Sequence, residues 1–265
     1  MAGLTTIKRN GSRYYVHPET QEKFPGVTSI LDMLPKPFLT PWASKLAAEY
    51  AADNIGAVVQ LLVGGQRQAA VDMIKGASRR FVSEAADVGT EVHDLFEKRA
   101  LGLPIGRPHP ELVPYLAHID DFLDTCQPRF LHVEDSVWSA EHRYAGSFDW
   151  IAQIDGRTFM GDTKSTRSGV HEPVAMQLAA YANADKIVTR AGAEIAVPAV
   201  DAHAVFHVRP EGWKLVPARA GRDVFDAFLV LRRVFDWETA IRHTVIGEAY
   251  HDSTVTTGAT RRKTR

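Results

Sequence analysis

The sequence YAGSFDWIAQIDGRTFMGDTKST, residues 144–166, is followed by a short loop and by PVAMQLAAY, residues 173–181. Two runs rich in aromatic and β-branched residues flank Asp155-Gly156, a dipeptide that tolerates the positive φ angles of a two-residue hairpin turn. The pattern therefore predicts a β-hairpin with these two residues as its loop. Counting outward along the two strands places Asp149 opposite Asp162.

Two acids and a lysine are predicted to share one face of this hairpin. Cross-strand neighbours have Cβ atoms roughly 4.5 to 5.5 Å apart, which would set the Asp149 and Asp162 carboxylates side by side. Side chains alternate along a strand, so Lys164 should lie on the face of Asp162 and Thr163 on the other face. Facing carboxylates repel each other, and a hard divalent cation such as Mg²⁺ or Mn²⁺ removes that repulsion. The alternative is an exposed hairpin face with solvated charges.

Three further polar residues stand in helical patterns. Gln177 and Tyr181 are four residues apart on a helix predicted from Glu172 to about Thr189, so they share one face of it. His93 lies beside the apolar stripe of a helix predicted over residues 78–100. A lone helical histidine is more often a core or surface residue than a metal ligand.

The predicted sheet begins with one strand over residues 130–138. Glu134 projects from this strand and is a secondary candidate for contact with a metal ion or with DNA. A last hairpin over residues 202–216 and a helix over residues 222–243 are predicted to complete the core.

The order and spacing of these polar residues resemble a known family. The motifs are Gly146-Ser-Phe-Asp149, Asp162-Thr-Lys164 and Gln177-x-x-x-Tyr181, with Gly89-Thr-Glu-Val-His93 upstream. They resemble those of PD-(D/E)XK nucleases of the RecB-like branch, in particular the phage exonucleases grouped with the CRISPR-associated iron-sulfur exonucleases. The resemblance covers about residues 80–240. It implies an α/β fold with a restriction-endonuclease-like core, in which helices flank a mixed central sheet in αβββαβ order, preceded by a helical region.

The resemblance also implies the roles of the site residues. It implies Mg²⁺ or Mn²⁺ as the cofactor, with the metal ligands His93, Asp149, Asp162 and the carbonyl of Thr163. Lys164 would act in catalysis together with the acids. Gln177 and Tyr181 would position the nucleic acid strand or hold the lysine.

The cysteine content departs from the iron-sulfur relatives. The chain has one cysteine, Cys126, whereas a cluster of that kind needs four thiolate ligands. We therefore expect no iron-sulfur cluster and no intramolecular disulfide.

Composition sets the outer bounds of the prediction. The 265 residues are 45% hydrophobic and 24% charged, with a net charge of −1, which is ordinary for a globular protein. Near-neutrality argues against a protein that coats DNA, although an enzyme that grips a few phosphates needs only a local positive channel. No apolar run approaches the roughly 20 residues that span a bilayer, and the N-terminus lacks a secretion signal, so we expect no membrane association and a cytoplasmic location. For a phage-encoded protein this would be the host cytoplasm.

Four regions are predicted along the chain. Residues 1–39 contain Pro18, Pro25, Pro35 and Pro37 and should form a β-ribbon or extended arm. Residues 40–125 should form a helical region that contributes His93, and residues 126–245 the nuclease core of sheet and helices. Residues 252–265 are polar and end in RRKTR, which indicates a disordered basic tail.

The predicted function is that of a metal-dependent DNA nuclease. An exonuclease of phage-type DNA recombination, replication or repair is favoured by the resemblance, which also suggests a single-strand annealing or recombination protein as partner and a homo-oligomer. The alternatives are a DNA-binding or replisome scaffold protein with the same fold and a metal-dependent phosphoesterase on another substrate. The sequence contains no phosphate loop of the Walker type, no His-Glu-x-x-His helix and no Gly-x-Ser-x-Gly elbow.

Overall fold

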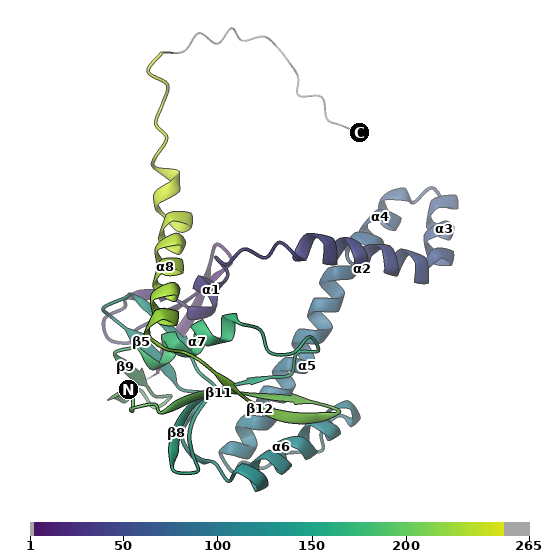
Figure 1. Ribbon diagram of the computed structural model, residues 1–265. Helices are drawn as coiled ribbons and strands as arrows, with labels where there is room; N and C mark the ends of the chain where they lie inside the picture. The colour runs from purple at the N-terminus through teal and green to yellow at the C-terminus, as the bar shows by residue number, and fades with distance from the viewer. Residues whose placement is uncertain (1–2, 252–265) are drawn as a thin grey trace.

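A computed structural model describes residues 3–251, except for the side chains of residues 84 and 85. At its centre lies a mixed five-stranded sheet in the order β12-β11-β8-β7-β4 (Figure 1). Only β8 and β11 run parallel, and the other neighbours are antiparallel. The strands are β4 (Arg129–Val133), β7 (Trp150–Ile154), β8 (Arg157–Lys164), β11 (Ala202–Arg209) and β12 (Gly212–Ala218).

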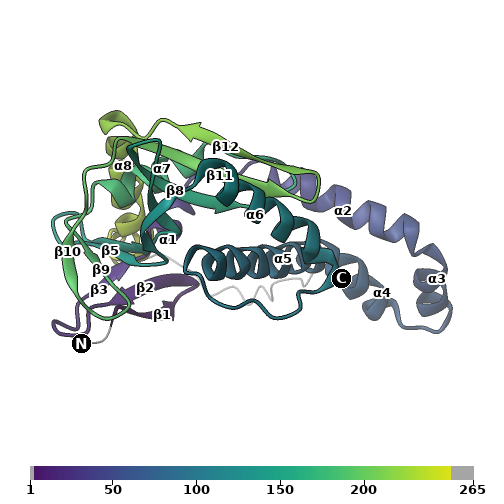
Figure 2. The same cartoon turned by 90° about the horizontal axis from the view of Figure 1, so that it is seen from below.

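Helices cover both faces of this sheet. On one face, α5 (Ala77–Ala100) and α6 (Val113–Cys126), which follows the short 3-10 helix η1 (Pro110–Leu112), lie side by side (Figure 2). The other face packs against α1 (Val27–Leu31), α7 (Pro173–Ala182) and α8 (Arg222–Thr239), which is followed by η2 (Ile241–His243). Alternation along β7 serves both cores, since Trp150 packs toward α5 and α6 and Ile151 toward α1, α7 and α8.

The predicted hairpin and its register are confirmed. Ile154 pairs with Arg157, and the ladder of β7 and β8 continues to the pair Trp150–Gly161. Glycine is required at position 161, because a Cβ atom there would lie 1.9 Å from the Trp150 ring. The ladder ends at this pair, so Asp149 precedes β7 and does not pair with Asp162 as a ladder neighbour.

The prediction of one strand over residues 130–138 is wrong. The chain leaves the five-stranded sheet after β4 and enters a second sheet, ordered β10-β9-β5-β6. Glu134 lies at the break with a left-handed φ of +53°. The second sheet contains β5 (Ser136–Ser139), β6 (Tyr144–Ser147), β9 (Lys186–Val188) and β10 (Glu194–Ala196).

A second break lies beside the first. The backbone N–H of Glu134 donates to the carbonyl of Asp149 at 2.8 Å, and that of Phe148 donates to the carbonyl of Asp135 at 3.0 Å. Both chain segments therefore cross from one sheet to the other at the same level, and their side chains are brought together there.

The helix predicted from Glu172 to about Thr189 is too long. It ends at Ala182, and β9 follows from Lys186. The Asp185 carboxylate accepts hydrogen bonds from the backbone N–H groups of Ala140 and Glu141, at 2.6 and 3.2 Å. These contacts hold the segment between α7 and β9 beside the end of β5, so the chain leaves the helix before Asp185.

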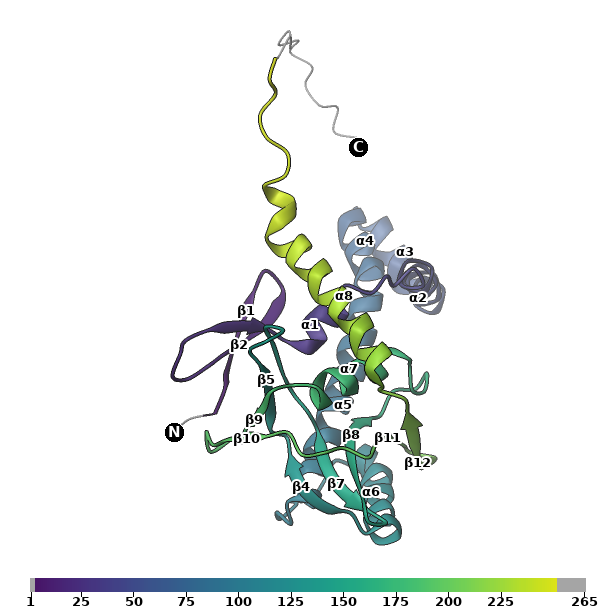
Figure 3. The same ribbon diagram turned by 60° about the vertical axis from the view of Figure 1, so that its left-hand side comes forward.

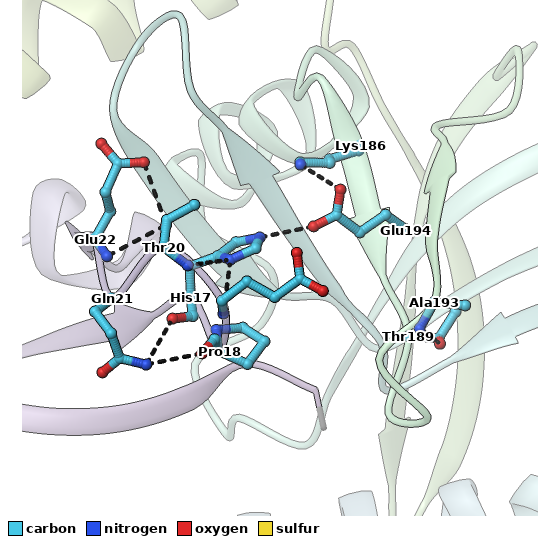
Figure 4. Close-up of polar contacts among 10 residues, drawn as sticks. His17, Pro18, Thr20, Gln21, Glu22, Lys186, Thr189, Ala193 and Glu194 are labelled. Carbon is cyan, nitrogen blue, oxygen red and sulfur yellow. Dashed lines mark hydrogen bonds and ion pairs between the residues drawn. The ribbon is translucent and has the colours of Figure 1, made fainter. Parts of the chain in front are cut away.

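The N-terminal segment forms a three-stranded antiparallel sheet of β1 (Thr5–Arg9), β2 (Ser12–Val16) and β3 (Lys23–Pro25), here called the ribbon. Figure 4 shows how buried His17 attaches it to the second sheet. Its Nδ1 accepts the backbone N–H groups of Glu19 and Thr20, so the proton is on Nε2, which donates to Glu194 at 2.7 Å. The His17 ring also packs edge-on against Trp138.

A helical arm extends from the body. It consists of α2 (Leu39–Asp53), α3 (Ile55–Val63), α4 (Arg67–Lys75) and the N-terminal half of α5. Figure 3 shows the arm and the ribbon on opposite sides of α1. In the described part of the chain, no single helix is both long and apolar enough to cross a membrane. Helices α2 and α3 together have the required length and composition, but a 78° bend separates them. The predicted basic tail, residues 252–265, lies outside the described residues.

Candidate metal centre

A pocket of about 610 Å³ opens where the two strand breaks meet α5, α7 and the ribbon. Most side chains singled out from the sequence line it, namely His93, Asp149, Asp162, Lys164, Gln177 and Tyr181. Thr163 is fully buried behind them. The pocket is also lined by Glu134, by Asp94 and Glu97 of α5, and by Arg13 and Tyr15 of the ribbon.

Three ligand-type side chains meet in this pocket. His93, Glu134 and Asp149 each offer one atom, and the three atoms all lie within 4.8 Å of one another. His93 Nδ1 is 3.4 Å from Asp149 Oδ2. The two acids stand at the two strand breaks, and α5 places the imidazole above them. One imidazole nitrogen and two carboxylates could hold a divalent ion of the kind that prefers oxygen and nitrogen ligands.

Glu134 carries the clearest marks of a functional residue. A non-glycine residue with a left-handed backbone is disfavoured by roughly 1 to 2 kcal/mol, and such strain gathers at functional sites. Burial, and then the nearby Asp149 carboxylate, raise the pKa of Glu134 to about 8. The nearby Arg190 guanidinium lowers this pKa only in part, so the charged form of Glu134 is poorly stabilised.

Asp162 lies beside this group but is held by other partners. Its Oδ1 accepts hydrogen bonds from Lys164 Nζ at 2.8 Å and from Gln177 Nε2 at 2.9 Å. The side chains of Asp162 and Lys164 therefore share a face, as alternation predicts. Burial and the Asp149 carboxylate raise the pKa of Asp162. Burial alone would lower the pKa of Lys164, but the Asp162 and Asp149 carboxylates outweigh it and raise that pKa.

The second oxygen of Asp162 is paired with the same lysine. Asp162 Oδ2 is buried and forms an ion pair with Lys164 Nζ at 2.6 Å, although no described residue gives it a well-oriented hydrogen bond. A carboxylate oxygen has lone pairs for more than one partner, so Oδ2 could also contact a cation bound in the pocket that Asp162 lines together with His93, Glu134 and Asp149.

The predicted ligand set is thus brought together in part. His93 and Asp149 meet directly and Glu134 joins them, while Asp162 lines the same pocket but is not part of this group of three. Asp149 Oδ2 also accepts the backbone N–H of Thr163 at 2.6 Å, which fixes the acid against the end of β8. A ligand role for the Thr163 carbonyl stays a prediction.

Gln177 and Tyr181 form a chain that leads to Asp162. Gln177 Nε2 also donates to the Tyr181 hydroxyl at 3.3 Å. Tyr181 is only 2% exposed, and burial raises its pKa well above the usual value, so the phenol stays neutral. Its ring packs so close to Gly146 that a Cβ there would lie 2.7 Å from it. This burial favours a positioning role for Tyr181, while its predicted contact with nucleic acid stays a prediction.

Arg190, which the sequence analysis did not single out, braces the break at Glu134. Its Nε donates to the Glu134 carbonyl at 3.1 Å, and its backbone N–H donates to Asp135 Oδ1 at 3.0 Å. Its guanidinium also pairs with Glu97 on α5. Arg190 thus ties α5 to the left-handed residue. No local pattern signals this role, because the partners are 55 residues or more away in the sequence.

Glu134 was the residue that sequence reasoning undervalued. The signal was the acid pair Glu134-Asp135, which interrupts an otherwise strand-like run. Comparison with protein-family models and with curated proteins finds no match to this chain. The case for function therefore rests on the pocket itself.

Proposed function

We propose that this chain is a metal-dependent DNA nuclease of the PD-(D/E)XK type, which hydrolyses phosphodiester bonds with Mg²⁺ or Mn²⁺. The observation that carries the proposal is the meeting of His93, Glu134 and Asp149 in one pocket with the Asp162–Lys164 pair. Two strand breaks, a helix and a hairpin converge to build this group, and three of its members are buried or half-buried acids.

The fold supports a restriction-endonuclease-like core. In chain order, the run α6, β4, β7, β8, α7 and β11 has the order αβββαβ; α1 and α5 precede it, and β12 and α8 follow it. The acids lie at the ends of β7 and β8, and the glutamine lies on the helix that follows.

The ligands would be His93, Glu134 and Asp149, and Asp162 lines the same pocket. A divalent ion bound there would lower the pKa of a bound water and offset negative charge on the phosphate.

Lys164, Gln177 and Tyr181 would stabilise the transition state and hold the site in position. Lys164 Nζ, held by Asp162, supplies a positive charge for the developing charge of the transition state. Gln177 donates to the same Asp162 oxygen as the lysine and fixes the carboxylate, and it donates in turn to the Tyr181 hydroxyl. The lysine is thereby preorganised before the substrate arrives, which is the condition under which electrostatic stabilisation is most effective.

The exonuclease mode, the role in phage-type recombination, replication or repair, and a recombination protein as partner follow from the sequence resemblance. They form part of the proposal on that basis, together with a homo-oligomeric state and a cytoplasmic location.

The test is hydrolysis of plasmid and linear DNA by the purified protein in EDTA, Mg²⁺ and Mn²⁺. Glu134→Gln and Asp149→Asn should each lower the metal-dependent rate by about a hundredfold or more, as expected for ligands of a catalytic ion. Glu141→Gln is the matched control, because Glu141 is an exposed acid outside the pocket. Metal-dependent binding of DNA without hydrolysis would indicate a scaffold protein instead, and hydrolysis confined to a small phosphodiester would indicate a different phosphoesterase.

A further inference from the structure

The ribbon contributes directly to the pocket that holds the candidate metal centre. Side chains alternate along β2, so Arg13 and Tyr15 lie on one face of this strand and Tyr14 lies on the other. Tyr14 packs against Phe235 of α8, whereas Arg13 and Tyr15 both line the pocket. The ribbon is therefore part of the wall of the site.

Tyr15 fixes the distance between the ribbon and the centre. Its hydroxyl accepts the backbone N–H of Ser147 at 3.0 Å and lies 3.2 Å from the Ser147 hydroxyl. Ser147 is two residues before Asp149, so this contact ties β2 to the strand break that carries a candidate ligand. Tyr15 is 4% exposed, which makes it a buried anchor.

The backbone of Arg13 is fixed as well. Its N–H donates to the Ser29 hydroxyl at 2.9 Å, and its carbonyl accepts the N–H of Gly26 at 2.8 Å. These bonds use backbone atoms only, so they would persist after substitution of the side chain. The Arg13 side chain is exposed and lies one strand repeat, roughly 7 Å, from Tyr15 along the same face.

The charges of the pocket single out this arginine. Its lining contains five acids but only two cations, Arg13 and Lys164. Lys164 is engaged by Asp162 at 2.6 Å. The Arg13 guanidinium forms no ion pair or hydrogen bond with any described residue, although its backbone is well anchored. Arg13 is therefore the cation of the pocket lining that is free to bind an anion, in a pocket whose acids otherwise repel anions.

We propose that Arg13 binds a phosphate group of the substrate strand other than the one that is hydrolysed. The inference rests on the proposed nuclease function and adds the ribbon as the element that guides the strand. A guanidinium binds phosphate oxygens in bidentate fashion, and its rigid fork suits a fixed phosphate position. The phosphate is either an internal one or a terminal one, and both have the same chemistry.

The experiment is fluorescence anisotropy with a labelled single-stranded oligonucleotide in EDTA, where hydrolysis does not occur. Arg13→Ala should weaken binding by about tenfold or more, the usual effect of losing a hydrogen bond to a charged group. The slope of log affinity against log salt should fall by about 0.7, the value for one phosphate contact on a single strand. Arg13→Lys should recover part of the affinity. Arg9→Ala, at an exposed ribbon position outside the pocket, should bind as wild type does.

Oligonucleotides with and without a terminal phosphate distinguish binding of a terminal phosphate from binding of an internal one. A loss confined to the phosphorylated strand assigns Arg13 to a terminal phosphate, and an equal loss on both assigns it to an internal one. Arg13→Ala that binds no more weakly than Arg9→Ala, with an unchanged salt slope, overturns the inference. Hydrolysis by wild type in Mn²⁺ is measured on the same preparation. If wild type hydrolyses DNA while Arg13→Ala binds normally, only this inference fails; if wild type does not hydrolyse DNA, the proposed function fails.

Discussion

Replacing Glu134 with glutamine should remove a pH-dependent destabilisation of the metal-free protein. The pKa of this carboxyl group is raised from 4.5 to about 8 in the folded chain. Between these values the folded protein binds the proton more tightly than the unfolded chain does. The free energy of unfolding therefore falls as the pH rises through this window, which is the sign expected for a raised carboxyl pKa.

The size of the effect follows from the shift. At 1.36 kcal/mol per unit, a rise from 4.5 to about 8 corresponds to a cost of about 5 kcal/mol at high pH. Glu134 is half-buried, so solvent and salt screen part of this cost, and we expect about 2 kcal/mol to be measured. Below about pH 4.5 the group is protonated in both states and contributes nothing.

The assay is urea denaturation in EDTA at several values between about pH 5 and pH 8.5. Glutamine keeps the shape of the side chain without its titration, so Glu134→Gln should exceed wild type in stability by about 2 kcal/mol at the upper end and by much less at the lower end. Asp162 also has a raised pKa, so the informative quantity is the difference between the two proteins. A difference that does not change with pH, or a variant less stable than wild type at pH 8, would refute the reasoning.

Three further substitutions test the groups around the centre. Lys164→Met should leave less than about a tenth of the hydrolysis rate while DNA affinity changes by less than about tenfold, because the lysine acts in the transition state more than in the ground state. Tyr181→Phe should keep the melting temperature but lower kcat, because Gln177 loses the hydroxyl that it contacts; full activity would make Tyr181 a core residue only. Arg190→Lys should retain more activity than Arg190→Ala, with weaker Mn²⁺ binding in the alanine variant, because the brace at Glu134 is lost. Equal Mn²⁺ affinity in wild type and both arginine variants would contradict this role.

The hairpin could be predicted from sequence because its determinants are local. Asp155-Gly156 sets the turn, and alternation then sets the register and the shared face of Asp162 and Lys164. The His93 position was also predictable, once its helix was placed by apolar periodicity. Each of these inferences needed only a few neighbouring residues.

The strand breaks could not be predicted in the same way. Residues 130–138 have the composition of one strand, and the change of sheet at Glu134 depends on Asp149 and Arg190, which are distant in the sequence. The same holds for the end of α7, which is set by the docking of Asp185 on β5. Tertiary contacts override local propensity at these places, and they are also where the candidate ligands lie.

The most direct test of the central claim is the effect of Mn²⁺ on the free energy of unfolding. If His93, Glu134 and Asp149 hold a divalent ion, wild type should gain RT ln(1 + [L]/Kd), about 2.7 kcal/mol at a hundred times Kd, relative to EDTA. Asp149→Asn should gain little, and Glu141→Gln should gain as much as wild type. Asp149 is the sharper choice than Asp162, whose loss would also release Lys164. No metal-dependent gain in wild type, or an equal gain in Asp149→Asn, would contradict the claim that these side chains share an ion.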